Sequence, residues 1–286
     1  MSSAIAAVQS AIAIKNILFT TDFSRCAGEA LPYAESLAER FGAHLHLCHV
    51  ITPSALISGA PEAAPYLYEA EYESSERDLK TLCNIEKKKG LKSSVIVDSG
   101  PLKGVIADLV EKNHIDLVVA ATHGHTGVTR LLLGSSVEEI CRTAPCPVLT
   151  IGPFLVSSDK VQFRRILVPT DLSAESMKVL PHVASMAQTY GSAIMVLNVL
   201  PPEMEAVAQS KITAVQTALQ ENLALCETQF LVECGDPAET ILRVSREKKA
   251  DLIAIGIRNA FAGPQIRSSI AYRVMAGAYC PVLTSR

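Results

Sequence analysis

The sequence predicts an α/β protein built from two tandem domains, each with a doubly wound, five-stranded parallel sheet. The length of 286 residues is about twice that of a typical single domain. The two halves of the chain repeat the same motifs in the same order, which indicates a duplicated fold. Within each half, short apolar runs alternate with helical patterns, and strands that alternate with helices are joined by crossovers into a parallel sheet.

The internal repeat defines the two domains. The segment 15–24 (KNILFTTDFS) recurs as 164–173 (RRILVPTDLS), and the segment 146–150 (CPVLT) recurs as 280–284. The separation falls from 149 to about 135 residues because the first copy carries a longer segment between residues 51 and 90. We expect an N-terminal extension over residues 1–14, a first domain over 15–151, a linker over 152–163 and a second domain over 164–286.

The apolar periodicity gives the order of elements within the first copy. Strands are predicted at 17–19, 44–50, 94–97, 117–120 and 148–151. Helices are predicted from about Ser24 onward, over 68–89, around 105–110 and over 137–142. Prolines and a glycine between residues 53 and 65 predict a loop before the second of these helices. The same order is expected in the second copy.

Two features are predicted to meet at one edge of the first sheet. Ligands of doubly wound sheets bind beyond the carboxyl ends of the strands, where the strand order reverses. Asp22 follows the first strand, whereas the stretches 121–124 and 134–136 follow the fourth strand and lead into a helix. The first amides of a helix lack partners and attract anions, and glycines such as Gly127 let backbone approach a ligand closely. The sequence therefore predicts a phosphate-binding edge.

Each of these features also has a purely structural interpretation. Ser135 with Glu138, three residues later, forms a capping box, and so does the next pair along the chain. Asp22, two residues before Ser24, is a common signal for the start of a helix. Only the convergence of the two features at one edge favours a ligand-binding role for Asp22.

The composition excludes several classes of protein. A hydrophobic fraction of 49% and a charged fraction of 19% are typical of a well-packed α/β protein. The net charge of −3 gives no basic footprint for nucleic acid. No apolar run approaches the ~20 residues that cross a membrane, and residues 1–14 lack the basic start of a signal peptide, so we expect a loose extension there. Neither nucleic acid nor a membrane is an expected partner.

The cysteines and histidines are expected to be structural. Eight cysteines without a secretion signal indicate a reducing compartment with free thiols. Cys146 and Cys280 each open a CPVLT string and are expected to be buried where a strand starts. His44, His46 and His49 lie on the second strand, with His44 and His46 on one face. No acidic residue or cysteine lies nearby at a ligand spacing, so no metal site is expected.

The motifs together resemble those of the universal stress protein family. They comprise Thr-Asp-x-Ser after strand one, His-Val after strand two, a small residue followed by Gly-x9-Gly-Ser after strand four, and Cys-Pro-Val at strand five. The resemblance covers both copies from residue 15 onward. It implies an adenine nucleotide alpha hydrolase-like fold and a cytoplasmic, stress-responsive regulator that binds ATP, with Mg²⁺ as an optional companion ion. It also implies that the copies pair through their fifth strands, and it leaves open a homodimer or another homo-oligomer and an unidentified protein partner.

The resemblance assigns site residues position by position. Asp22 and Val50 fall on the nucleoside side, with Thr21 beside them. The positions that match the phosphate loop and its start are Ala121, Gly124, Gly134, Ser135 and Ser136. Ala121 stands where the family usually has its first glycine, which is tolerable as long as the backbone there keeps a negative φ.

The second copy departs further from the family pattern. Gly256 is present, but Asn259 stands at the second glycine position. One residue is missing before the helix, so that Ser268, Ser269 and Ile270 replace Gly-Ser-Ser, and Pro264 removes an N–H donor from the loop. We expect this copy to bind nucleotide weakly or not at all and to be structural, with Asp171 retained as a turn residue.

Two functions of different classes remain. The first is a regulatory protein that binds ATP in its first domain. The alternative is a nucleotide-free scaffold for protein interactions, built as an internal pseudo-dimer, although a scaffold does not require the glycines of the first loop. A dedicated enzyme is not expected because the sequence lacks GxxxxGK[ST], GxGxxG after strand one, HExxH and GxSxG, which leaves at most slow incidental ATP hydrolysis.

Overall fold

The computed structural model of the chain describes residues 12–52, 64–123, 133–153, 161–219, 223, 226–257 and 268–286. These residues form two compact units. One unit consists of Ile14–Val161, and the other of the chain from Gln162 onward together with Ile12 and Ala13. Most of the expected extension and linker lies outside the described residues. Ile12 is nevertheless held in place, because its carbonyl oxygen accepts a hydrogen bond of 2.6 Å from Ser185 Oγ.

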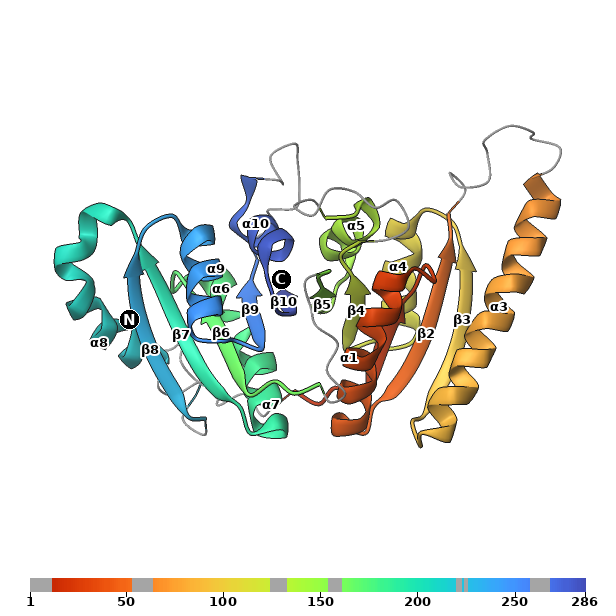
Figure 1. The fold of residues 1–286 in the computed structure, drawn as a ribbon, viewed down its shortest axis with the longest axis horizontal. Coiled ribbons are helices and arrows are strands. Elements are labelled where there is room, and N and C mark those ends of the chain that lie inside the picture. The colour runs from red at the N-terminus through yellow and green to blue at the C-terminus, as the bar shows by residue number, and fades with distance from the viewer. Residues whose placement is uncertain are drawn as a thin grey trace. The chain divides into compact units, whose positions relative to one another are not determined.

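The first unit, coloured red to green in Figure 1, is a parallel sheet whose strands alternate with helices. Its elements in chain order are β1 Asn16–Thr20, α1 Arg25–Phe41, β2 His44–Ile51, α3 Ala64–Lys88, β3 Ser93–Ser99, α4 Leu102–Lys112, β4 Leu117–Ala121, α5 Ser135–Thr143 and β5 Val148–Ile151. The strands lie in the order β3-β2-β1-β4-β5, and all their pairings are parallel. The strand order therefore reverses between β1 and β4, which is where doubly wound sheets bind ligands.

The second unit, coloured green to blue in Figure 1, repeats this arrangement. Its elements are β6 Arg165–Pro169, α6 Ala174–Met177, α7 Leu180–Tyr190, β7 Ala193–Leu200, the 3-10 helix η2 Pro202–Val207, α8 Ala208–Leu219, β8 Thr228–Cys234, α9 Pro237–Glu247, β9 Leu252–Gly256, α10 Ile270–Gly277 and β10 Val282–Ser285. The strand order β10-β9-β6-β7-β8 is again all parallel. The predicted fold of two tandem doubly wound domains is confirmed.

The central strands are buried on both faces. Ile17, Leu18 and Phe19 of β1 are at most 1% exposed, and Val118 and Val119 of the adjacent β4 are fully buried. Such continuous burial is expected of a parallel sheet, because the crossover helices cover both of its faces. It also explains why these strands are visible in the sequence as short, unbroken apolar runs.

Prolines lie in three of the helices, with different effects. α3 begins at Ala64 rather than at residue 68, with Pro65 in its first turn, where a helix does not use the missing N–H. α1 runs without interruption through Pro32, whereas the equivalent Pro181 lies in the first turn of α7, behind a break that separates off the short α6. Proline alone therefore did not determine where these helices begin or break.

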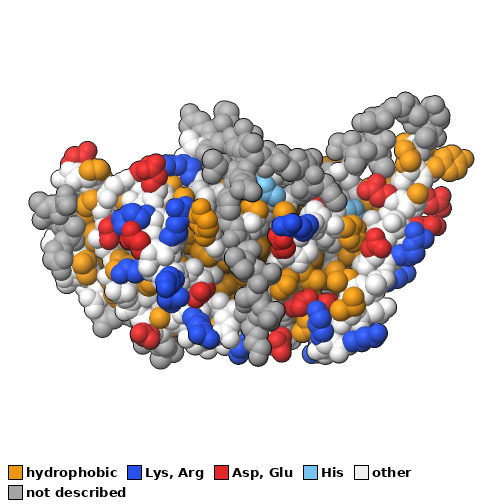
Figure 2. All heavy atoms as spheres, in the orientation of Figure 1, with side chains coloured by type: hydrophobic (Ala, Val, Ile, Leu, Met, Phe, Trp, Pro, Cys, Tyr) orange, Lys and Arg blue, Asp and Glu red, His pale blue; other side chains and the backbone are white. Residues whose placement is uncertain are grey.

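The described surface carries charges of both signs. Acidic and basic side chains are interspersed over the face shown in Figure 2, in keeping with the small net charge of −3. Such mixing produces no extended field of one sign. In the parts of the chain that the structure describes, every helix is too short or too polar to span a membrane.

Candidate functional site

Three side-chain oxygens in succession build the turn after β1. Thr21 Oγ1 accepts a hydrogen bond of 2.9 Å from the Phe23 amide. Asp22 Oδ1 accepts one of 3.0 Å from the Ser24 amide, and Ser24 Oγ caps α1 by accepting one of 3.2 Å from the Ala27 amide. Phe23 has a φ of 61°, a left-handed conformation that costs energy for so bulky a side chain. The Thr-Asp-x-Ser motif thus holds a strained bend that starts the helix.

The second domain forms the same turn with the same bonds. Thr170 Oγ1 accepts from the Leu172 amide at 3.0 Å, and Asp171 Oδ1 accepts from the Ser173 amide at 2.9 Å. Ser173 Oγ accepts from the Ser176 amide at 3.2 Å, and Leu172 has a φ of 63°. Both aspartates therefore serve the start of a helix. The motif by itself does not distinguish a domain that binds a ligand from one that does not.

A donor from the second strand of each sheet ties this turn to the sheet. His49 Nδ1 donates a hydrogen bond of 2.8 Å to the carbonyl oxygen of Thr21, and Asn198 Nδ2 donates one of 2.7 Å to that of Thr170. Because a carbonyl only accepts, this bond places the proton of the His49 ring on Nδ1. Sequence reasoning misses this role of His49, although the repeat carries the signal, since His49 and Asn198 are equivalent and both can donate.

The long helix of the first domain reaches the same edge. The His49 ring lies 4.9 Å from the ring of Phe23, and its Nε2 lies 3.9 Å from Oε1 of Glu71 in α3. Tyr68, one turn earlier in α3, donates a hydrogen bond of 3.1 Å to Ser99 Oγ at the end of β3. The longer segment that distinguishes the first domain therefore packs beside the carboxyl ends of β2 and β3.

The predicted nucleoside residues lie together at this edge. The Thr21 amide donates to the Cys48 carbonyl at 2.9 Å, which places Thr21 and Asp22 beside Val50 near the end of β2. Ala121 ends β4 on the other side of β1, level with Thr21 by the register of the two strands. The structure thus brings together the predicted residues that follow β1 and those at the ends of β2 and β4.

The start of α5 lies at the end of β4. The amide of Gly134 donates a hydrogen bond of 2.8 Å to the carbonyl oxygen of Thr122, so this amide is already engaged. A Cβ at position 134 would lie 3.2 Å from the same oxygen, which explains why glycine suits this close approach. Gly124 and Gly127 lie outside the described residues. His123, next to Thr122, has a pKa lowered by burial and is therefore neutral at physiological pH.

The N-cap residue of α5 supplies no side-chain cap. It is Gly134, in an extended conformation with φ −63° and ψ 146°, and among the described residues no side chain accepts a hydrogen bond there. The capping-box interpretation of Ser135 and Glu138 is therefore wrong, because Ser135 is already the first residue of the helix. Ser135 and Ser136 are exposed. Their amides, with that of Val137, are the unpaired donors that a helix N-terminus offers to an anion.

The equivalent helix of the second domain caps itself. Ser269 is the N-cap of α10, with φ −66° and ψ 145°, and its Oγ accepts a hydrogen bond of 3.2 Å from the Tyr272 amide. The matching cap geometries show that Ser269, not Ser268, is equivalent to Gly134. α10 has eight residues and α5 has nine, and both end before an alanine C-cap, Ala144 or Ala278. Counted between the caps, the missing residue therefore falls in the first turn of the helix, next to where the sequence places it.

The end of β9 is packed more closely than the end of β4. A Cβ on Gly256 would lie 2.2 Å from the carbonyl oxygen of Glu175 and 2.7 Å from Cα of Ser176. The short helix α6 therefore lies directly against β9, and the Ser176 and Thr170 hydroxyls are hydrogen-bonded at 2.9 Å. The first domain has Ala121 at the position of Gly256, so its methyl group prevents an equally close approach of α1.

Of the two thiols predicted to be buried, Cys280 is buried, whereas Cys146 is only half-buried. Burial raises the pKa of both Cys146 and Cys280 to about 12, so each stays a protonated, weakly nucleophilic thiol. Each lies two residues before its strand, β5 or β10. All eight cysteines are free.

The paired histidines lie at the amino end of β2, away from the site. His44 and His46 have ring centroids 4.5 Å apart, and each ring has a nitrogen 3.0 Å from Ser94 Oγ. Burial, with a smaller contribution from His44, lowers the pKa of His46 to about 4. A search of the described ranges finds no cluster of three or more His, Cys, Asp or Glu able to hold a metal ion.

Comparisons with known proteins agree with the duplicated fold. A family model described as the universal stress protein family matches residues 13–152 and again residues 162–286. The chain is 25% identical over 299 residues to universal stress protein Slr1230 of Synechocystis sp., which covers 96% of this chain and 100% of the relative. It is 31% identical over 139 residues to universal stress protein MJ0531 of Methanocaldococcus jannaschii, covering 48% of this chain and 81% of the relative.

A solved structure extends the agreement to the whole fold. The crystal structure of a universal stress protein from Archaeoglobus fulgidus matches with a TM-score of 0.76 at 21% identity, over 95% of this chain and 96% of that one. At this level of identity the likeness concerns the fold alone. The shared fold extends over both halves of this chain.

Proposed function

Because this chain belongs to the universal stress protein family through both of its halves, we propose that it is a stress-response regulator that binds ATP in its first domain. The second domain, in this proposal, has lost nucleotide binding. Occupancy of the first site by ATP would change a surface that a partner protein or a second chain recognises. ATP, with or without Mg²⁺, is the proposed ligand.

The observation that carries this proposal is the difference between the starts of α5 and α10. The amides of Ser135 and Ser136 begin α5 without a competing side-chain oxygen, whereas Ser269 already occupies the Tyr272 amide in α10. A triphosphate needs several unpaired donors and the positive end of a helix dipole. The first domain offers both, and the second offers fewer donors behind the hydrocarbon side chain of Ile270.

The nucleoside would lie beside the turn after β1. Thr21, Asp22, Val50 and Ala121 lie together at the carboxyl edge, at the reversal of strand order. One oxygen of Asp22 holds the turn, and a carboxylate has about four acceptor positions. The proposal assigns to the same carboxylate both the turn and an acceptor role toward the nucleoside. Gly124 is proposed to line the phosphates by resemblance only.

Further properties belong to the same proposal. Eight free cysteines suit a reducing cytoplasm. None of the proposed site residues is a histidine, lysine or cysteine positioned as a base or nucleophile, so we propose binding without dedicated catalysis and at most slow ATP hydrolysis. If the first domain does not bind ATP, the protein is better described as a nucleotide-free scaffold.

Calorimetric titration of ATP, with and without Mg²⁺, tests the proposal. Wild-type protein should bind one ATP per chain and melt at a higher temperature in its presence, because a ligand selective for the native state stabilises it. Gly134→Asp should abolish binding, since it places a carboxylate where the phosphates would lie. Asp171→Ala, in the second domain, is the matched control and should bind as the wild type does. Absence of both heat and thermal stabilisation at millimolar ATP would refute the proposal.

A further inference from the structure

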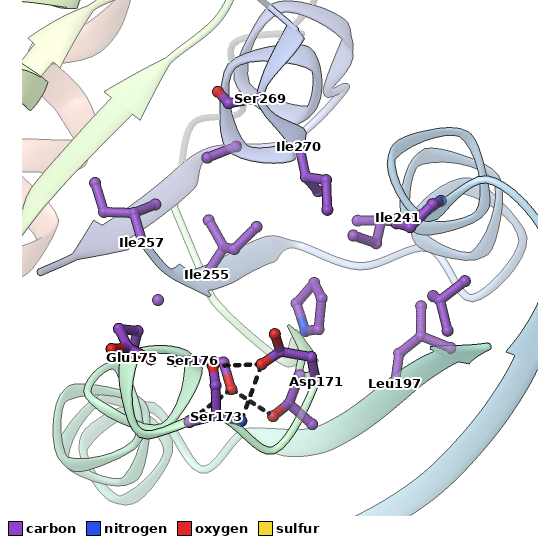
Figure 3. Close-up of a pocket in the computed structure, with 16 residues that line it drawn as sticks. Asp171, Ser173, Glu175, Ser176, Leu197, Ile241, Ile255, Ile257, Ser269 and Ile270 are labelled. Atoms are coloured by element: carbon purple, nitrogen blue, oxygen red, sulfur yellow. Dashed lines mark hydrogen bonds between the residues drawn. The ribbon is translucent and has the colours of Figure 1, made fainter. Parts of the chain in front are cut away.

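The second domain contains a pocket at the same carboxyl edge, with a volume of about 290 Å³. Its walls come from β6, α6, β7, α9, β9 and α10, and Figure 3 shows Ile241, Ile255 and Ile270 pointing toward one another across it. Ile241 and Ile255 are buried, whereas Ile270 is 41% exposed at the mouth. A concave, mostly apolar site of this size is typical of a small-ligand pocket at the low end of the usual range.

The repeat shows how the chemistry of this edge has changed. The strand registers are the same in the two domains: Thr20 pairs with Cys48 as Pro169 pairs with Leu197, and Ala120 pairs with Thr150 as Ile255 pairs with Thr284. These registers and the helix starts make six lining positions equivalent between the domains. In the order first domain to second, they are Thr20 to Pro169, Cys48 to Leu197, Ala120 to Ile255, Thr122 to Ile257, Ser135 to Ile270 and Ser136 to Ala271. Four hydroxyl groups are thereby replaced by hydrocarbon, whereas the change is in the opposite direction at two lining positions of α6, from Cys26 to Glu175 and from Ala27 to Ser176.

The hydroxyls that remain around the pocket are bonded to the protein itself. Ser173 Oγ receives the Ser176 amide and donates to Asp171 Oδ1. Ser176 Oγ is hydrogen-bonded to Thr170 Oγ1, and Ser269 Oγ receives the Tyr272 amide. In Figure 3 these groups surround the Asp171 turn or cap the helix, while the isoleucines face the cavity. A ligand in this pocket would therefore contact mainly hydrocarbon.

We propose that the pocket of the second domain binds an uncharged, largely apolar small molecule, no larger than a two-ring aromatic compound. The hydrocarbon walls disfavour a phosphate, because an anion buried against them finds few donors and lies near the carboxylates of Asp171 and Glu175, which also line the pocket. Displacing water from these walls provides the driving force for an apolar ligand. The second domain thus offers a ligand site of different chemistry, and this inference does not depend on ATP binding in the first domain.

Isoleucine methyl NMR with indole as the probe tests this site directly. Indole should produce saturable shifts at the δ1 methyl groups of Ile241, Ile255 and Ile270. Ile106, which is equivalent to Ile241 in the first domain and fully buried, should not shift. Absence of saturable shifts, or equal shifts at Ile106, would overturn the proposal. Calorimetry with ATP is read separately, so failure of the first site and failure of this one are distinguishable.

A matched pair of variants locates the binding. Ile270→Glu places a carboxylate at the pocket mouth, and should weaken indole about tenfold or more. Glutamate at the first position of a helix is favourable, so this variant should fold. Ile85→Glu, at a position that is 45% exposed in the first domain, makes the same change on the surface and should leave indole affinity unchanged. Equal affinity of wild type and Ile270→Glu would contradict the assignment.

Discussion

Gly134 and Ser269 precede equivalent helices with nearly the same backbone angles, but only Ser269 supplies an oxygen to the amides that follow it. As N-cap residues, glycine and serine differ by only a few tenths of a kcal/mol. The main consequence of the difference is therefore which amides a bound anion can use. Gly134 therefore leaves the first amides of α5 without a side-chain acceptor of its own, whereas Ser269 supplies one to the first amides of α10.

Gly134→Ser should give α5 the side-chain cap that Ser269 gives α10. A serine hydroxyl at this position would accept from the amide of Val137 and compete with phosphate, so ATP affinity should fall about tenfold or more. The Cβ would press on the Thr122 carbonyl at 3.2 Å, a contact that a small backbone shift can relieve. Titration calorimetry measures the loss, and Ser269→Gly serves as the control with unchanged affinity. Wild-type affinity of Gly134→Ser would show that these amides do not bind the ligand.

Gly256→Ala should destabilise the second domain. The added methyl group would lie 2.2 Å from the Glu175 carbonyl oxygen, so α6 must move away from β9. Overpacking of this kind costs about 2–3 kcal/mol, which urea unfolding can resolve. The reciprocal variant Ala121→Gly should cost less than about 1 kcal/mol, because it only removes a methyl group from a strand end. Equal effects of the two variants would mean that the contact with α6 carries no energetic weight.

The hydrogen bonds that His49 and Asn198 donate to the turn after the first strand of each domain should contribute more to the free energy of unfolding than a surface hydrogen bond does. Asn198 is buried, and Asn198→Ala leaves the Thr170 carbonyl oxygen without its donor, at a cost of about 1–3 kcal/mol. His49→Ala should act in the same direction in the first domain. His49→Asn, which introduces the residue that the second domain uses, should recover part of that loss. Chemical denaturation checks all three variants, and no difference between His49→Ala and His49→Asn would argue against a shared role.

The histidine pair should make stability depend on pH. The pKa of His46 is lowered from its ordinary value of 6.5 to about 4 by burial, so the unfolded chain takes up a proton before the folded protein does. Stability is therefore complete above pH 6.5 and is lost as the pH falls toward 4. Between pH 7.5 and 5 the free energy of unfolding should fall by about 2 kcal/mol from this group. Urea unfolding of His46→Gln should show a smaller fall, and an identical pH dependence would contradict this account.

Sequence patterns predicted the strands better than the ends of the helices. Buried parallel strands such as β1 and β4 are continuous apolar runs, because both faces are covered, and their order follows from the crossovers. Helix ends depend on which backbone groups find partners in three dimensions. Gly134 is the cap because its backbone is extended while its carbonyl accepts the Glu138 amide, and no pattern in the sequence around Ser135 and Glu138 reveals this.

The pocket of the second domain could not be predicted from the sequence either. Its hydrocarbon walls come from five separate segments, so no local motif marks them. The comparison of equivalent positions, such as Ser135 with Ile270, becomes meaningful only once the helix starts are aligned. If the alignment instead places the missing residue before the helix, Ser135 is compared with Ser269 rather than with Ile270. That comparison shows no loss of a hydroxyl group at this position.

A crystal structure grown in saturating ATP and Mg²⁺ tests the central claim most directly. The account predicts electron density for a triphosphate within hydrogen-bonding distance of the Ser135 and Ser136 amides, with no nucleotide at the start of α10. A first-domain site that stays empty under these conditions, or nucleotide bound equally at both helix starts, would contradict it.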